Sequence, residues 1–121
     1  MTDIYRFQTS KRMSQAVVAP AGRTVYLAGQ VATDRTANTG QQAEEVLAKI
    51  DALLAQCGTS KAHLLSAQVW LADIKDFDEM NAKWDAWVPD GHAPARACVQ
   101  SHMAKPDIRV EIQVVAWCPP A

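Results

Sequence analysis

The chain has 121 residues, of which 49% are hydrophobic and 21% charged, a balance typical of one globular domain. Twelve basic residues nearly balance thirteen acidic ones, so no overall charge favours binding to nucleic acid or to a membrane surface. The apolar runs are far shorter than the roughly 20 residues of a membrane span, and the first residues lack the layout of a signal peptide. We therefore expect one cytoplasmic domain over residues 1–121.

Three cysteines, an odd number without paired spacing, argue against a disulfide framework or a zinc site. Cys57 continues an apolar helical stripe and is predicted to lie in the core. Cys118 lies in a proline-rich tail and is predicted to have no role. Cys98 differs from both because it stands two residues from an arginine on a predicted strand.

The first half of the chain predicts a hairpin and a helix. Two β-prone runs, 14–19 and 24–30, flank turn residues and predict the hairpin, and residues 31–38 are interpreted as a loop or a frayed third strand. A capping box at Thr39–Gln42 opens the helix, and Gly58 stands where a left-handed C-terminal cap belongs. The apolar stripe of this helix consists of Ala43, Val46, Leu47, Ile50, Leu53, Leu54 and Cys57.

The second half predicts a strand, a helix and two more strands. Residues 64–73 alternate between apolar and more polar positions, as a strand does, and a second capping box at 76–79 opens a helix that stops before Pro89. The apolar stripe of this helix consists of Phe77, Met80, Trp84 and Trp87. Strands follow at about 95–101 and 108–117. The order β-β-(β)-α-β-α-β-β predicts an α+β domain with two helices against one sheet.

Two helices can cover only one face of that sheet, yet the other face also carries large apolar side chains. They are Tyr26, Ala28, Trp70, Val115 and Trp117. Because a patch of this size should not lie bare to water, we expect another subunit to cover part of the face.

The last two predicted strands carry charged residues in an apolar setting. Arg96 and Cys98 should share one face of their strand, and Glu111 lies opposite the apolar stripe of the final strand. Burying such charges costs free energy, which indicates a polar site. The alternative interpretation is a structural ion pair between Arg96 and Glu111 across adjacent strands.

Six segments in a fixed order carry a family resemblance. They are Ser14-Gln15-Ala16, Leu27-Ala28-Gly29-Gln30, Val69-Trp70-Leu71-Ala72-Asp73, Asp76-Phe77 with Met80-Asn81, Pro94-Ala95-Arg96-Ala97-Cys98-Val99 and Val110-Glu111-Ile112. In order and spacing this set resembles the Rid (YjgF-type) family of reactive-intermediate deaminases, over residues 13 to 117. The resemblance implies a chorismate-mutase-like fold, with one mixed six-stranded sheet and two helices on one face, assembled as a homotrimer. Clefts at the subunit boundaries would bind small carboxylic acids.

The resemblance also implies an activity and residues for it. Active members hydrolyse enamines and imines, such as 2-aminoacrylate, to 2-keto acids and ammonia, and need no metal or organic cofactor. Arg96 matches the family's carboxylate-binding arginine, and Glu111 matches its glutamate; these are the two predicted catalytic residues. Cys98 matches a thiol near the ligand, and Gly29 matches a strand glycine that offers a backbone donor. Cys98 is not expected to be a nucleophile, since no histidine is placed to activate it.

Two further residues are predicted to contact the ligand, and they leave the function open. Met13 stands where a tyrosine is usual and makes the pocket wall more apolar, while Asn81 could instead form local hydrogen bonds. Met13 and Gln113, the latter in place of a second acidic residue, favour a non-catalytic trimer that binds a small carboxylate as a sensor or partner protein. A ribonuclease activity is a third interpretation, weakened because the chain has no basic stripe with interleaved aromatic residues.

Overall fold

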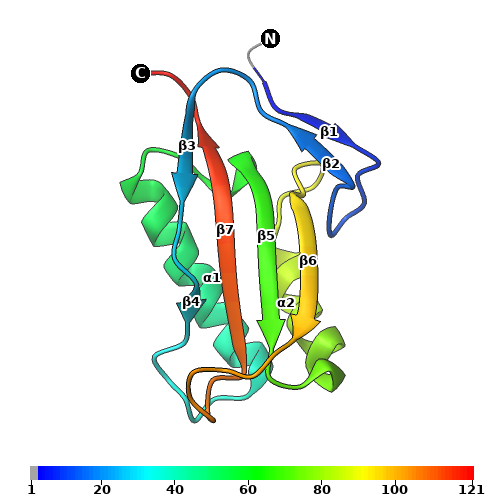
Figure 1. Cartoon of the computed structure of the whole chain (residues 1–121), viewed down its shortest axis with the longest axis vertical. Coiled ribbons are helices and arrows are strands. Elements are labelled where there is room, and N and C mark those ends of the chain that lie inside the picture. The colour runs from blue at the N-terminus through cyan, green and yellow to red at the C-terminus, as the bar shows by residue number, and fades with distance from the viewer. Residues whose placement is uncertain (1–2) are drawn as a thin grey trace.

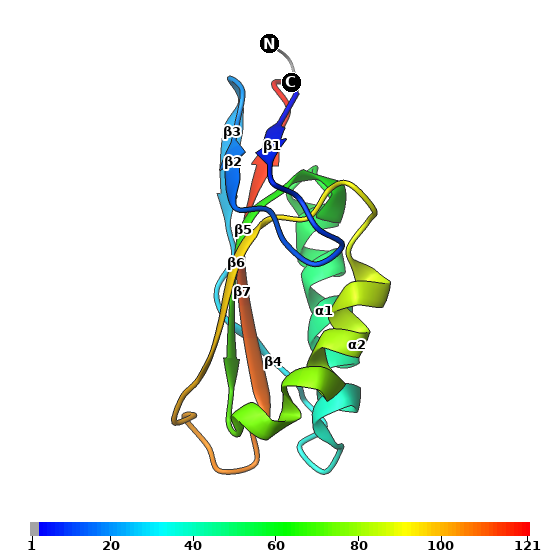
Figure 2. The same cartoon turned by 90° about the vertical axis from the view of Figure 1, so that its right-hand side faces the viewer.

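The structure is a computed structural model that describes residues 3–121. Its elements, in chain order, are β1 (Tyr5–Phe7), β2 (Ala16–Val18), β3 (Arg23–Tyr26), β4 (Gln30–Val31), α1 (Thr39–Gln56), β5 (Leu64–Leu71), α2 (Phe77–Trp87), β6 (Ala95–Gln100) and β7 (Val110–Cys118). Figure 1 shows their arrangement, and Figure 2 shows both helices on the same side of the main sheet.

The main sheet has five strands in the order β3-β7-β5-β6, with β4 pairing to β7 below β3. Only β5 and β6 run parallel, so the sheet is mixed. The predicted α+β class and the two helices on one face are confirmed. The prediction of a single six-stranded sheet is wrong, because β1 and β2 form a separate two-stranded sheet.

The predicted hairpin between residues 14–19 and 24–30 is also wrong. Strand β2 pairs antiparallel with β1, which sequence analysis did not identify, and β3 pairs with β7 at the far end of the chain. The turn residues between β2 and β3 therefore carry the chain from one sheet to the other. A strand of three residues such as β1 is too short to show a clear alternation, which is why it escaped prediction.

The start of α1 is capped one residue earlier than predicted. Asn38 is the N-cap: its side chain accepts from the N–H of Gln41 at 2.8 Å, and the Gln41 side chain accepts from the N–H of Asn38 at 3.2 Å. This is a capping box shifted by one position. At the other end, Gly58 has a φ of 82°, so the left-handed cap is confirmed.

Two of the three cysteines lie where they were not expected. Cys57 is exposed, because α1 ends at Gln56 and the residue caps the helix beyond the core. Cys118 is buried in β7, where its sulfur lies near the carbonyl oxygens of Cys57 and Gly58, at 3.6 and 3.5 Å. Its side chain thus fills space at the C-terminal end of α1 and is part of the packing.

The hydrophobic core lies between the sheet and the helices. Alternate residues of β5 and β7 face inward, and the residues of this core with no exposed surface include Val46, Ile50, Leu54, Leu64, Val69, Leu71, Met80, Trp84, Val110, Ile112 and Val114. Burial of one such side chain stabilises a fold by about 1.5–3 kcal/mol. The predicted stripes of both helices are therefore the surfaces that hold the sheet.

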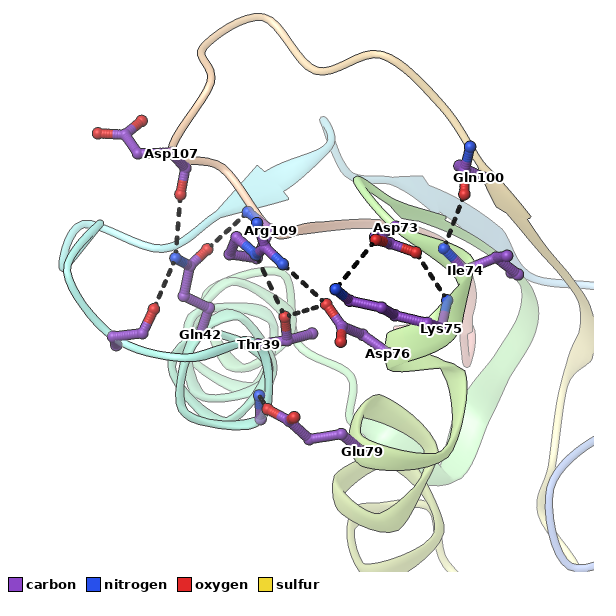
Figure 3. A network of polar contacts seen from close by, with 12 residues as sticks. Thr39, Gln42, Asp73, Ile74, Lys75, Asp76, Glu79, Gln100, Asp107 and Arg109 are labelled. Atoms are coloured by element: carbon purple, nitrogen blue, oxygen red, sulfur yellow. Dashed lines mark hydrogen bonds and ion pairs between the residues drawn. The ribbon is translucent and has the colours of Figure 1, made fainter.

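The second predicted capping box does not form at the start of α2. Asp76 makes no side-chain cap, and its carboxylate instead accepts from the Thr39 hydroxyl at 2.8 Å and from the Arg109 guanidinium at 3.0 Å. Glu79 accepts from the N–H of Gly40 at 2.5 Å. Both carboxylates thus leave their own helix and bind the first turn of α1, as Figure 3 shows.

Gln42 completes this network from inside the domain. Its side chain is fully buried, donates to the carbonyls of Ala37 and Asp107 at 3.2 and 3.1 Å, and accepts from the N–H of Arg109 at 2.9 Å. Figure 3 shows these bonds joining the start of α1 to the loop that precedes β7. Because every polar group of the amide has a partner, the buried polar residue costs little stability.

The face of the sheet opposite the helices carries the expected apolar side chains, with one exception. Tyr26 is 76% exposed, Ala28 is exposed, and Trp70 and Val115 are half-buried. Trp117 is only 5% exposed, because its indole donates to the carbonyl of Ala21 at 3.2 Å and its ring packs edge-on against His63. Within residues 3–121, no helix is long and apolar enough to cross a membrane.

Candidate functional site

Arg96 and Cys98 lie on β6, the strand at the edge of the main sheet, and share one face as predicted. In the parallel pairing of β6 with β5, Arg96 is opposite Ala67 and Cys98 is opposite Val69. Ala67 and Val69 are buried on the helix side of the sheet. Both predicted site residues therefore point toward α2.

The guanidinium of Arg96 has two nitrogens that find no partner among the described residues. Its Nε and Nη1 atoms are buried and have no hydrogen-bond partner among residues 3–121. The guanidinium carbon lies 5.0 Å from the centre of the Trp84 ring, which is fully buried on α2. Burial lowers the pKa of Arg96 from its usual value, and the negative charge of Asp85 partly opposes that shift. A guanidinium in this state has donors that no described residue uses, and a carboxylate is the group with which such donors form their strongest pairs.

A second arginine lies against the same face of α2. Arg12, from the loop before β2, donates two hydrogen bonds to Asp85, Nε to Oδ1 at 2.9 Å and Nη2 to Oδ2 at 2.8 Å. Its guanidinium also lies 5.7 Å from the ring centre of Phe77. The hydrogen bonds from Arg12 lower the pKa of Asp85, so the pair stays ionised.

Cys98 lies half-buried beside these charges. Burial raises the pKa of its thiol, and the positive charges of Arg96 and Arg12 only partly oppose that rise. The thiol therefore stays protonated near neutral pH, and a neutral thiol is a poor nucleophile. A protonated thiol fits the expectation that Cys98 is not a nucleophile, and its place beside a ligand stays a prediction.

Asn81 and Met13 occupy different environments. Asn81 is fully buried on α2, three residues before Trp84, and neither atom of its amide has a hydrogen-bond partner among the described residues. The alternative that Asn81 bonds locally is therefore wrong. Met13 is half-buried in the loop before β2, where its carbonyl accepts from the N–H of Ser10 at 2.8 Å. The following residue, Ser14, joins that loop to the segment before β6 through the carbonyl of Ala93 at 2.6 Å.

Gly29 and Glu111 form a second group on the open face of the sheet. Glu111 lies on β7, opposite Trp70 of β5 and Val31 of β4. A side chain at position 29 would collide with the Glu111 carboxylate, so the glycine provides the space that the carboxylate occupies. These two predicted residues are therefore in contact with each other.

The two groups do not meet within one chain. Arg96 faces the helices, Glu111 faces the open side, and β5 lies between their strands. The alternative of a structural Arg96–Glu111 ion pair is therefore wrong for a single chain, because the strands are not adjacent and the side chains point to opposite faces. Each chain carries two separate candidate half-sites: one of Arg96 and Cys98, and one of Gly29 and Glu111.

Sequence reasoning missed three residues that lie near Arg96: Trp84, Arg12 and Asp85. The apolar stripe of α2 predicts Trp84 as a core residue, and nothing in that pattern reveals its contact with Arg96. Arg12 lies in a loop, and Asp85 lies on the polar side of the predicted helix, so each reads as an ordinary surface charge. Only the packing of the loop against α2 brings them together.

Comparison with known proteins assigns the fold to a family. Residues 4–118 match the family described as Endoribonuclease L-PSP. A RutC family protein from Haemophilus ducreyi is 41% identical over 113 residues, which span 93% of this chain and 95% of that protein. A crystal structure of a YjgF family member from Neisseria meningitidis has a TM-score of 0.77 and 45% identity, covering 99% of this chain and 98% of that one. The 2-iminobutanoate/2-iminopropanoate deaminase of Salmonella typhimurium is 29% identical over 104 residues, 78% of this chain and 80% of that protein.

Proposed function

The chain belongs to the Endoribonuclease L-PSP (YjgF/Rid) family, and from that premise we propose that it hydrolyses small 2-imino acids, or their enamine tautomers, to 2-keto acids and ammonia. The observation that carries the proposal is the state of Arg96, a fixed, desolvated cation with two buried nitrogens that lack partners among residues 3–121. The name of the Salmonella relative supports the choice of an imino acid as substrate.

Arg96 would bind the carboxylate of the substrate. A guanidinium presents a planar fork to a carboxylate, and the resulting pair orients the bound acid as well as holding it. The amide of Asn81, which is buried on α2 three residues before Trp84 and has no partner among the described residues, would supply a further polar contact to the bound acid. Binding would thereby satisfy groups that are otherwise left without partners, each at a cost of about 1–3 kcal/mol.

The chemical step needs a second group, which we assign to Glu111 of another copy of the chain. In a homotrimer, the open face of one copy would lie against the edge strand of the next, so that Glu111 and Gly29 approach Arg96 across the boundary. The exposed Tyr26 and half-buried Trp70 and Val115 on that face support such an assembly, since they need to be covered. The expected mass of the assembly is about 40 kDa.

The reaction would proceed by addition of water to the imine. With the imine nitrogen protonated, the carbon is electrophilic, and Glu111 accepts a proton from the water as its oxygen bonds to that carbon. Glu111 passes this proton to the nitrogen and then takes the proton of the new hydroxyl group as the carbon–nitrogen bond breaks and the carbonyl forms. The leaving ammonia takes that second proton and departs as ammonium, which returns Glu111 to its carboxylate form. Arg96 holds the acid so that the water and the carbon meet in the correct geometry.

A non-catalytic carboxylate-binding protein is the second candidate, and one observation favours it. Arg96 faces the helices, whereas Glu111 of the same chain lies on the opposite face of the sheet. Within one chain, the group that would bind a carboxylate is thus separated from the group that would activate water. Both candidates bind the carboxylate through Arg96, and they differ in whether the bound imino acid is hydrolysed.

The experiment measures turnover and binding on the same preparations. An amino-acid oxidase generates the 2-imino acid in solution, and the decay of the imine is followed with wild-type protein, Arg96→Lys and Arg96→Met. Arg35→Lys is the matched control, because Arg35 pairs with Asp107 in a loop that is no part of either half-site. Arg96→Lys keeps the charge but loses the planar fork, so we expect at least a tenfold weaker binding of 2-oxobutanoate, with a larger loss in Arg96→Met. Wild-type binding that depends on Arg96, without any acceleration of imine decay, would establish the second candidate instead.

A further inference from the structure

Arg96 poses a structural question, because a long side chain at a sheet edge normally needs an ion pair to fix it. Among residues 3–121 its Nε and Nη1 have no hydrogen-bond partner, yet they are buried. The contact that remains is the face of the Trp84 ring, 5.0 Å from the guanidinium carbon. A cation above an indole ring is attracted by about 0.5–2 kcal/mol, and more strongly when both groups are desolvated.

The ring of Trp84 is itself held in one orientation. It is fully buried, and its indole N–H donates to the backbone carbonyl of Arg12 at 2.8 Å. The side chain of the same Arg12 makes its bidentate pair with Asp85, the residue after Trp84 on α2. Arg12, whose carbonyl accepts the indole hydrogen bond, is therefore tied by its own side chain to α2, the helix that carries Trp84.

These contacts differ from an ion pair because they do not use the N–H groups of Arg96. A carboxylate beside Arg96 would occupy the N–H groups that a ligand needs, whereas the face of an aromatic ring contacts the plane of the guanidinium and uses none of them. The arginine over the ring is thus ordered before a ligand arrives, and no described residue takes up its Nε and Nη1 donors. Ordering a flexible side chain on binding costs about 0.5–1.5 kcal/mol, which the stacking would remove from the cost of binding.

We propose that Trp84 is a positioning residue for the carboxylate-binding arginine, and that the Arg12–Asp85 pair fixes Trp84 through the Arg12 carbonyl. This inference rests on the proposed role of Arg96 in binding a carboxylate, and it does not require that the protein be a catalyst. It assigns a function to the aromatic residue of α2 that the hydrophobic pattern alone marks as core.

The test uses Trp84→Leu, which removes the ring, and Trp84→Phe, which keeps a smaller ring but loses the bond to Arg12. Trp87→Leu is the matched control, because Trp87 lies next to Trp84, at 5.4 Å between ring centres, and its indole bonds to Asp51 instead. Calorimetry with 2-oxobutanoate should show about tenfold weaker binding for Trp84→Leu and a smaller loss for Trp84→Phe. Trp87→Leu should bind as the wild type does, even where its melting temperature falls.

A second readout does not depend on any ligand. In the ligand-free wild type, the Arg96 Nε–H resonance, assigned by its absence in Arg96→Lys, should be shifted upfield by the indole ring. The shift should disappear in Trp84→Leu and persist in Trp87→Leu. If Trp84→Leu fails to fold, Trp84→Phe supplies the same comparison with a reduced shift.

An unshifted resonance in the wild type, or unchanged 2-oxobutanoate affinity in a folded Trp84 variant, would overturn the inference. Wild-type protein that binds 2-oxobutanoate but hydrolyses no imine would refute only the proposed activity, while absence of Arg96-dependent binding would overturn both.

Discussion

Arg96 and Glu111 point to opposite faces of the sheet, and this leads to a prediction about oligomers that contain two different variants. If the two residues act together, they must come from different copies, because within one chain β5 separates their strands and the side chains point to opposite faces. Arg96→Met alone and Glu111→Gln alone should each abolish most turnover. A mixed oligomer, however, should contain some sites that take Arg96 from one variant and Glu111 from the other.

The size of the recovery follows from the geometry of a ring of identical subunits. Each site between neighbours takes its arginine from one subunit and its carboxylate from the next, so random mixing of equal amounts leaves about one quarter of the sites intact. The two variants are unfolded together, refolded as a mixture, and assayed for imine decay. We expect about one quarter of wild-type turnover from the mixture, against about 1% or less from either variant alone.

The controls separate assembly from chemistry. Refolded wild type must recover its activity, and light scattering must show that every sample has the same mass of roughly 40 kDa. Mixing Arg96→Met with a second preparation carrying both substitutions should give no recovery, since no intact pair can then form. A mixture of the two single variants that remains as inactive as its components, despite forming mixed oligomers, would refute the assignment of the two residues to one shared site.

Three further predictions concern single residues. Glu111→Gln should lower imine turnover by about 10²-fold while changing the melting temperature little, because Glu111 is not the partner of Arg96 within the chain. The control is Glu44→Gln, which removes the same charge from an exposed pair with Lys83 on the helix side. A large loss of stability in Glu111→Gln would contradict the geometry. Gln42→Met should lower the free energy of unfolding by roughly 3 kcal/mol or more in urea denaturation, because three backbone groups lose their partners, whereas Gln56→Met on the exposed end of α1 should have little effect. The Glu45 carboxylate accepts from the N–H groups of Thr33 and Asp34, which lower its pKa from 4.5 to about 2, so its stabilising contribution should be complete above pH 4.5 and be lost as pH falls through 2. An NMR titration of Glu45 with a midpoint near 4.5 would show that these bonds do not form in solution.

The elements that sequence analysis predicted well are those with long, regular patterns. The stripes of α1 and α2 and the alternation in β5 and β7 repeat over eight residues or more, and their apolar residues are buried or half-buried except for Cys57 at the end of the α1 stripe. Short elements were predicted poorly: β1 has three residues, and β2, which leads into the turn that suggested a hairpin, pairs with β1 instead of β3. A local pattern predicts that a segment is a strand, but it does not predict which strand lies beside it.

The capping signals show how tertiary contacts override local ones. Asp76 and Glu79 have the spacing of a capping box, but Thr39, Gly40 and Arg109 offer partners from elsewhere in the chain. A carboxylate that reaches the first turn of another helix gains the same favourable placement near backbone N–H groups, and it joins two elements as well. No pattern within residues 76–79 could reveal those partners.

The site residues were predicted by type and position, and their grouping was not. Arg96, Cys98 and Glu111 stand out in sequence as polar residues on apolar strands, which is enough to identify them as site candidates. Their separation depends on β5 being inserted between β6 and β7, a consequence of the parallel β5–β6 pairing that connects across α2. Arg12, Trp84 and Asp85 could not be assigned at all, because their significance lies in contacts between a loop, a helix and a strand.

The separation of the two charges has a physical advantage for a site of this kind. A glutamate within reach of Arg96 in the same chain would pair with it during folding, and the pair would occupy the donors that a substrate needs. With Glu111 on the other face, the chain can fold around an arginine that packs over the Trp84 ring, and in the proposed assembly the carboxylate would come from another copy. The first anion that can satisfy the buried nitrogens of Arg96 is then one brought by a ligand or by a neighbouring subunit. For this reason the state of the Arg96 guanidinium is the observation on which the proposed site rests.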